Sequence, residues 1–261
     1  MHPELIQTKY FTINTLWVLI AVAIIVTVYV ITKLATRSGL KIQFLSSYAW
    51  KIILVALAGA RIFTIIENPK TYFYEFSGKV FLQLFYVWDK GLNIWGAVIA
   101  GALFMFYLCK KHEQDFWKWM DTIVPAMILG FAIVHIGAFF EGINYGNETS
   151  LPWGVNFESP AIKYTVPIHP TQIYAFLYSL TIAITLILIG RSEKITNISR
   201  SGFIAILGTG IYAFFQFLEQ FVRGDDTLMI FGIRVPQIIA LLIAILSGIF
   251  LYLRYNKPAK T

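Results

Sequence analysis

The stretch FTINTLWVLIAVAIIVTVYVIT, residues 11–32, contains no charged side chain. A helix of about 20 apolar residues crosses the hydrocarbon core of a bilayer, so this stretch predicts a transmembrane helix. Six further windows have a similar composition. Together they predict a single all-α membrane domain, 1–261, built as a bundle of seven transmembrane helices at about 11–32, 50–66, 91–109, 122–140, 169–190, 202–222 and 235–253.

The composition excludes a water-soluble globular protein. Hydrophobic residues make up 57% of the chain and charged residues 13%, whereas a soluble domain has about 25% charged residues. One cysteine, Cys109, permits no internal disulfide, and no Cys/His spacing is typical of a zinc site. We therefore expect neither a metal nor another cofactor. The formal charge of +7 fits contact with anionic lipid headgroups, and we expect no nucleic-acid partner because no soluble basic face is visible.

Lysine and arginine residues are distributed unevenly between the two sides of the predicted bundle. Thirteen fall in the connections 33–51, 110–121 and 191–200 and in the C-terminal tail, and seven fall on the opposite side. The positive-inside rule therefore predicts an outward N-terminus and a cytoplasmic C-terminus. On the outward side we expect an interfacial or re-entrant segment at 80–90. We also expect an ordered loop region at 141–168, because long loops rich in glycine and proline often carry functional sites.

Arg61 is the clearest charge at membrane depth, in LAGARIFTIIENP (57–69). A charge in the hydrocarbon costs at least a few kcal/mol, so Arg61 needs a partner. Small residues just before it leave room for a lipid headgroup, and a guanidinium group suits a phosphate. The alternative interpretation is a structural ion pair with Glu141 or Glu219.

Two histidines lie near the outward ends of predicted spans. His135 is followed by Glu141 and Asn144 in HIGAFFEGINYG (135–146), where glycines permit tight turns. A lone buried histidine is usually a packed core residue, but this polar cluster favours a function. His169 opens the next span and has the chemistry of a general base, or it is an interfacial polar cap. Gln172 carries an amide into the membrane beside it.

The sixth predicted span carries a polar stripe. Its residues follow the spacing i, i+4, i+7 and i+11, which places them on one helical face, and they are Tyr212, Gln216, Glu219 and Arg223. Lipid would penalise such a face, so the stripe is predicted to point into the bundle. It either lines a site or forms a structural seam.

These segments together resemble the prolipoprotein diacylglyceryl transferase family. The similar blocks occur in the family's order, and they are GARIFTIIENPKTYF (59–73), GLNIWGAVIAG (91–101), HIGAFFEGINYGNETSLPWGVNF (135–157), HPTQIY (169–174) and QFLEQFVRGDD (216–226). The resemblance covers nearly the whole chain. It implies a bacterial inner-membrane enzyme with seven spans, which moves a diacylglyceryl group from phosphatidylglycerol to the lipobox cysteine of a prolipoprotein.

The resemblance also implies roles for particular residues. The candidate catalytic residues are His135, His169 and Tyr212. The resemblance supports His169 and Tyr212, which match the family, whereas His135 is a candidate through its own chemistry, either as an imidazolium toward phosphate or as a base toward the thiol. The candidate phospholipid-binding residues are Arg61, Glu141, Asn144, Gly146, Gln172, Gln216 and Arg223, of which Arg61, Gly146, Gln172 and Arg223 match the family. The implied partners are phosphatidylglycerol, prolipoprotein signal peptides with a lipobox cysteine, and other membrane lipids. No cofactor is needed for displacement at carbon.

Several positions depart from the family's pattern. His135 and Gln216 stand where the family has arginines, Trp95 stands where it has a histidine, and Ala138 replaces an asparagine. Two readings therefore compete: an active transferase with a rebuilt site, and a non-catalytic paralogue that binds lipid or a membrane partner. A transporter or channel is a weaker third reading, because the sequence has no internal repeat.

The predicted orientation can be tested by labelling single cysteines in intact cells. A cysteine at position 147 should react with an impermeant reagent from outside, because it follows the fourth span. A cysteine at position 194 should react only after permeabilisation. The reverse pattern would invert the topology.

Overall fold

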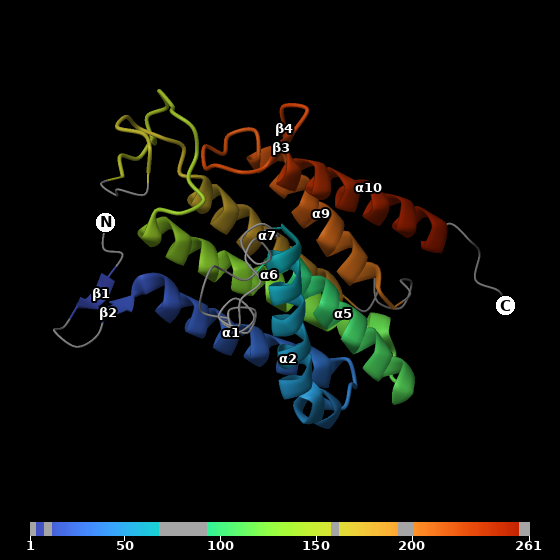
Figure 1. Cartoon of the computed structure of the whole chain (residues 1–261). Helices are drawn as coiled ribbons and strands as arrows, with labels where there is room; N and C mark the ends of the chain where they lie inside the picture. Colours follow the sequence, from blue (N-terminus) through green and yellow to red (C-terminus); the bar gives the residue numbers. More distant parts are fainter. Residues whose placement is uncertain (1–3, 8–11, 68–92, 158–161, 193–200, 256–261) are drawn as a thin grey trace, which may run out of the picture. The chain divides into compact units, whose positions relative to one another are not determined.

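The computed structural model describes residues 4–7, 12–67, 93–157, 162–192 and 201–255. Seven helices lie within these ranges (Figure 1), and five of them are long and apolar enough to cross a membrane. The five are α1 (Thr15–Arg37), α2 (Ile42–Glu67), α6 (Phe116–Glu141), α7 (Thr171–Arg191) and α10 (Val235–Tyr255). The two others are α5 (Ile94–Lys111) and α9 (Phe203–Glu219). The chain is a multi-pass helical membrane protein, as its hydropathy predicts.

The helices extend beyond the charge-free windows. Helix α6 begins at Phe116 rather than at 122, and α1 continues to Arg37 rather than ending at 32. Charged residues near a helix end can keep their charges in water while the helix continues, so hydropathy underestimates helix length. The predicted interfacial segment 80–90 lies outside the described residues.

Two short antiparallel hairpins were not part of the all-helical prediction. They are β1 (Glu4–Gln7) with β2 (Thr12–Asn14), and β3 (Met229–Ile230) with β4 (Ile233–Arg234). The second hairpin turns through Phe231 and Gly232, whose φ angles are 52° and 79°. Both angles are positive, as a tight two-residue hairpin turn requires. This hairpin leads directly into α10.

The chain folds into two compact units, residues 1–37 with 117–261, and residues 38–116. In the first unit, α9 packs against both α7 and α10. Helices α7 and α9 come close because α9 has a glycine at 208, where a Cβ would lie 2.5 Å from the Leu186 Cδ1. The core of this unit is a cluster of buried apolar residues: Ile128, Ile182, Ala183, Leu186 and Ile204.

Asp121 fixes the start of α9 from a distant part of the same unit. Its carboxylate accepts hydrogen bonds from the backbone N–H groups of Gly202, at 2.6 Å, and Ala205, at 2.8 Å. Such a carboxylate satisfies donors that have no partner inside the helix and complements the helix dipole. The first turn of α9 is therefore held by α6.

The second unit contains α2 and α5, which cross at small residues. A Cβ on Gly59 would meet the Cβ of Ala100 and the carbonyl oxygen of Gly96, so the two backbones touch where no side chain intervenes. Asn93 caps α5, because its side chain accepts a hydrogen bond from the Gly96 N–H. Arg61 belongs to this unit, on α2, and is only 5% exposed.

Backbone hydrogen bonds tie three separate segments of the first unit together around Gly146. Gly146 donates to the carbonyl of His169 at 3.1 Å, Asn147 donates to the carbonyl of Val222 at 2.8 Å, and Gly224 donates to the carbonyl of Tyr145 at 2.9 Å. We call residues 145–147, 168–169 and 222–224 the Gly146 crossing. It orders part of the predicted loop region and attaches this region to the end of α9.

The crossing leaves no room for a side chain at Gly146. A Cβ there would lie 2.5 Å from both the Cβ and the carbonyl oxygen of His169, and 2.9 Å from the carbonyl oxygen of Val222. We expect Gly146→Ala to lower the free energy of unfolding by about 2–3 kcal/mol, as overpacking does. Gly248→Ala is the matched control, because a Cβ at Gly248 has nothing within 4 Å. Thermal unfolding in detergent measures both, and equal midpoints would contradict the crossing's importance.

Candidate functional site

The predicted polar stripe on α9 points at α7. The Tyr178 hydroxyl donates a hydrogen bond to Glu219 Oε2 at 2.7 Å, and Gln216 Nε2 donates to the Tyr178 hydroxyl at 2.5 Å. Gln216 also lies 3.5 Å from the hydroxyl of Tyr212. Glu219 is buried, with 5% of its surface exposed. The stripe therefore faces a neighbouring helix of the first unit, as predicted.

Arg223 lies beyond the end of α9, which stops at Glu219. The predicted span continued to 222, so the helix is shorter than expected. The guanidinium group nevertheless contacts the stripe, because Arg223 Nη1 donates a hydrogen bond to Glu219 Oε1 at 3.1 Å. Its Nη2 donates to Asn144 Oδ1 at 2.9 Å. Arg223 thus joins the polar stripe to the loop that follows α6.

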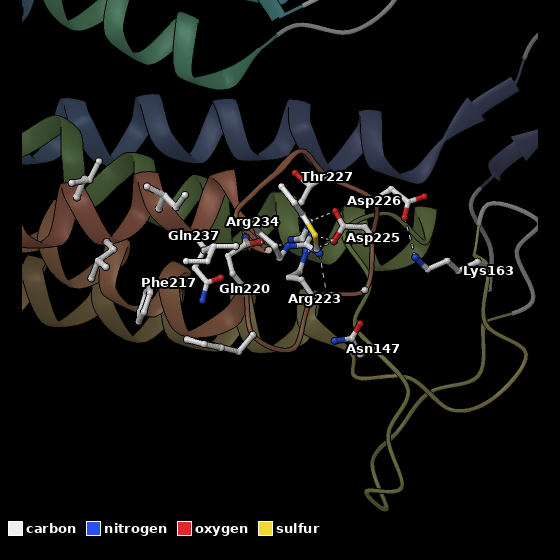
Figure 2. Close-up of a pocket in the computed structure, with 18 of the residues that line it drawn as sticks. Asn147, Lys163, Phe217, Gln220, Arg223, Asp225, Asp226, Thr227, Arg234 and Gln237 are labelled. Carbon is white, nitrogen blue, oxygen red and sulfur yellow. Dashed lines mark hydrogen bonds and ion pairs between the residues drawn. The ribbon is translucent and has the colours of Figure 1, made fainter.

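A second arginine shares a carboxylate with Arg223. Asp225 accepts from Arg223 Nε and Nη2, both at 2.7 Å, and from Arg234 Nη2 at 2.9 Å. Arg234 Nε donates to Gln220 Oε1 at 2.8 Å. Figure 2 shows both guanidinium groups converging on Asp225. Two arginines and two carboxylates therefore balance in charge within this network.

Arg223 and Asp225 keep their charges at neutral pH. Burial by itself would lower the pKa of Arg223, but the hydrogen bonds and negative charges of Asp225 and Glu219 outweigh burial and raise that pKa. Burial would likewise raise the pKa of Asp225, yet Arg223 and Arg234 hold it below its usual value. Each ion stabilises the charged form of its partner.

Three candidate residues present buried polar atoms that have no hydrogen-bond partner among the described residues. These atoms are His135 Nε2, Glu141 Oε2 and Gln172 Oε1. His135 also interacts electrostatically with Arg223. The other end of the Gln172 amide is fixed, because Nε2 donates to the carbonyl of Ile143 at 2.7 Å. Buried polar atoms are normally satisfied, so these three are candidates for contact with a ligand.

His169 is held by both its backbone and its ring. Its N–H donates to the carbonyl of Asn147 at 2.9 Å within the Gly146 crossing. Its Nδ1 lies 3.2 Å from the hydroxyl of Tyr174, which also accepts a hydrogen bond from Trp153 Nε1 at 2.8 Å. The crossing therefore places His169 beside Gly146, while its ring is attached to the start of α7.

The structure brings most of the predicted site residues into the first unit. Hydrogen bonds, backbone pairing or electrostatic contact link six of them into one region: His135, Asn144, Gly146, His169, Gln216 and Arg223. Tyr212 and Gln172 adjoin this region through Gln216 and the Asn144 loop. Glu141 ends α6 in the same unit, and Arg61 lies in the other unit.

Sequence reasoning missed four members of the network, Tyr178, Gln220, Asp225 and Arg234. Tyr178 is a single hydroxyl in an apolar helix. Asp225 lies within a short acidic segment after Arg223, which was part of the family-like block QFLEQFVRGDD. Arg234 directly precedes the last apolar stretch, and this position was the one available signal, because a charge there must lie at the membrane surface or find a partner.

Comparisons with known proteins match nearly the whole length of the chain. The profile of the prolipoprotein diacylglyceryl transferase family matches residues 3–253. A phosphatidylglycerol–prolipoprotein diacylglyceryl transferase of Prochlorococcus marinus is 30% identical over 83% of this chain and 77% of its own. The enzyme of the same name from Finegoldia magna is 29% identical over 95% of this chain and 94% of its own. The one from Clostridium tetani is 28% identical over 97% of both chains. The chain belongs to the prolipoprotein diacylglyceryl transferase family.

Proposed function

We propose that this protein transfers the diacylglyceryl group of phosphatidylglycerol to the lipobox cysteine of a prolipoprotein. The observation that carries the proposal is the buried network of Arg223, Glu219 and Asn144, with the unpartnered His135 Nε2 beside it. The named activity of relatives that align along the chain supports it. The non-catalytic paralogue is the weaker reading.

The reaction forms one bond and breaks one. The cysteine sulfur attacks the glycerol carbon that carries the phosphate. A carbon–sulfur bond forms, the carbon–oxygen bond breaks, and glycerol phosphate leaves with the electron pair. The thiol must lose its proton, because the thiolate is the nucleophile. The leaving phosphate needs hydrogen-bond donors or cations.

The geometry supports a division of these tasks. Glu219 is already engaged by Tyr178 and Arg223, so it is poorly placed to accept another proton. His135 Nε2 has no partner among the described residues, and the lone pair of a neutral imidazole nitrogen can accept a proton. His135 is therefore our candidate for the base that accepts the thiol proton. His169 and Tyr212 are placed at the edge of the same region, where they position the substrates.

Phospholipid binding is assigned to the donors and amides around this base. Arg223 uses four of its N–H groups on protein acceptors, which leaves one for a phosphate oxygen. Gln172 Oε1 and Glu141 Oε2 are acceptors for the hydroxyls of a glycerol headgroup. Asn144, Gly146 and Gln216 shape this site. Arg61, which belongs to the other unit, is also proposed to bind the phosphate of a phospholipid.

The proposed cellular setting is the bacterial inner membrane. The distribution of lysine and arginine supports an outward N-terminus and a cytoplasmic C-terminus. In that orientation the Gly146 crossing lies at the outer surface. A prolipoprotein signal peptide that spans the same membrane would present its lipobox cysteine there.

The role of His135 can be tested in proteoliposomes that contain phosphatidylglycerol and a lipobox peptide. We expect His135→Arg to reduce transfer by about 100-fold or more, since general bases contribute at least that much and a guanidinium accepts no proton. Mass spectrometry of the peptide, which gains one diacylglyceryl group, measures transfer.

His112→Arg is the matched control, because His112 ends α5 and stacks on Tyr48 in the other unit, and it should leave transfer unchanged. If His135→Arg retains or increases transfer, the side chain at this position acts as a cation toward phosphate instead. If folded, lipid-bound wild type transfers nothing, the protein is not an enzyme of this kind.

Arg61 is predicted to hold the lipid phosphate with two parallel N–H donors. Arg61→Lys keeps the charge and loses this fork, so we expect the KM for phosphatidylglycerol to rise about tenfold with little change in the unfolding temperature. Arg37→Lys, at the exposed end of α1, is the control for the same chemical change. Unchanged lipid affinity in Arg61→Ala would show that Arg61 is structural.

A further inference from the structure

A cavity of about 990 Å³ lies in the first unit, between α9, α10 and the connection that joins them. Helix α9 contributes Phe217, the turn after it contributes Phe221, and α10 contributes Ile238, Leu241 and Leu242. The connection 224–234 closes one end, where Lys163 from the long loop also reaches the rim (Figure 2). The network around Asp225 forms part of the wall, but the cavity extends away from it along α10.

The cavity has one polar end and one apolar end. Lys163, Asp226 and Arg234 lie at the polar end, next to the start of α10 at Val235. Because a helix rises 1.5 Å per residue, Leu241 lies about 9 Å along the helix from Val235. Helix α10 is apolar enough to span a membrane, so the cavity runs from the surface into the hydrocarbon. This shape suits an amphiphile.

The rim of the cavity is apolar as well as exposed. The β3–β4 hairpin lines one side through Met229, Gly232 and Ile233. Its turn residue Phe231 is 100% exposed, and Leu228 just before it is 71% exposed. Aromatic and aliphatic tips next to a transmembrane helix lie at the headgroup level of a bilayer. The mouth of the cavity therefore opens to lipid rather than to bulk water.

The charges at the polar end differ in how firmly they are engaged. Arg234 is buried and bound to Gln220 and Asp225. Lys163 and Asp226 pair with each other at 2.9 Å, and their side chains are 48% and 92% exposed. An exposed pair contributes little stability, so a ligand can separate it. This polar end offers a cation and a carboxylate side by side.

We propose that this cavity binds a second phospholipid, with a zwitterionic phosphoethanolamine head, that is not the substrate of the transfer reaction. Lys163 contacts the lipid phosphate, Asp226 contacts the primary ammonium, and an acyl chain lies between α9 and α10. The phosphate of phosphatidylglycerol could contact Lys163, but its headgroup has no cation for Asp226. The quaternary ammonium of phosphatidylcholine is positively charged, but it has no N–H group to donate to Asp226. The bound lipid holds residues 220–234, which include Arg223 and Asp225, against α10.

The test is native mass spectrometry of the purified full-length protein with dioleoyl phosphatidylethanolamine, phosphatidylcholine and phosphatidylglycerol, each titrated separately. We expect the ethanolamine lipid to bind about three- to fivefold more tightly than phosphatidylcholine, as one additional exposed charged contact allows. Asp226→Asn should remove this preference and strengthen the binding of phosphatidylglycerol. Lys163→Gln should weaken all three lipids.

Two further variants distinguish the contribution of the cavity's apolar end from that of its charged residues. Leu241→Trp should fill the apolar end and weaken all three lipids, with unfolding temperatures confirming that each variant is folded. Glu148→Gln is the matched control for Asp226→Asn, because Glu148 is an exposed carboxylate on the loop that carries Lys163 and does not line the cavity. It should change none of the affinities.

Equal affinities for the ethanolamine and choline lipids, or an affinity for the ethanolamine lipid that Asp226→Asn and Leu241→Trp leave unchanged, would overturn the proposal. The proposal would also be overturned if a lipobox peptide displaced the ethanolamine lipid and Leu241→Trp blocked binding of that peptide. The cavity would then be a peptide-binding site. If the protein transfers diacylglycerol but shows no preference among the lipids, the second lipid site is wrong and the proposed transferase function still stands.

Discussion

The Gly146 crossing is the contact on which the candidate site depends. Its backbone hydrogen bonds join segments that are far apart in the chain, and they place Asn144, His169 and Arg223 in one region. Backbone pairing can do this because Gly146 and Gly224 have no side chains to keep the strands apart. Without the crossing, the loop after α6 would have no fixed relation to the end of α9, and Arg223 would lose its amide partner.

The charges around the crossing are organised as a closed network rather than as an open cationic pocket. Arg223 and Arg234 share Asp225, and Glu219 takes a further donor from Arg223. Breaking one partner of such a buried set leaves an uncompensated charge. The network therefore defines a rigid wall. A phosphate at this wall must use the remaining N–H of Arg223 and cations from elsewhere in the chain.

The sequence predicts the parts of this structure that follow from local patterns. Helices at membrane depth follow from hydropathy, and the contact of Gln216 and Glu219 with α7 follows from their helical spacing. The missed features depend on partners distant in the chain. Tyr178 acquires its role only because α9 packs on α7, and Asp121 caps a helix that starts far along the chain, at Phe203. The hairpin before α10 was missed because its strands are two residues long.

Helix α9 is also shorter than the bilayer it is expected to cross. Its 17 residues extend about 26 Å, whereas a typical hydrocarbon core is about 30 Å thick. A short span is accommodated by local thinning of the bilayer. The phosphate layer next to α9 would then be drawn inward, toward Glu219 and Arg223. A lipid could thus bring its glycerol carbon to the network while its acyl chains stay in the membrane, and hydrophobic mismatch itself would deliver the substrate.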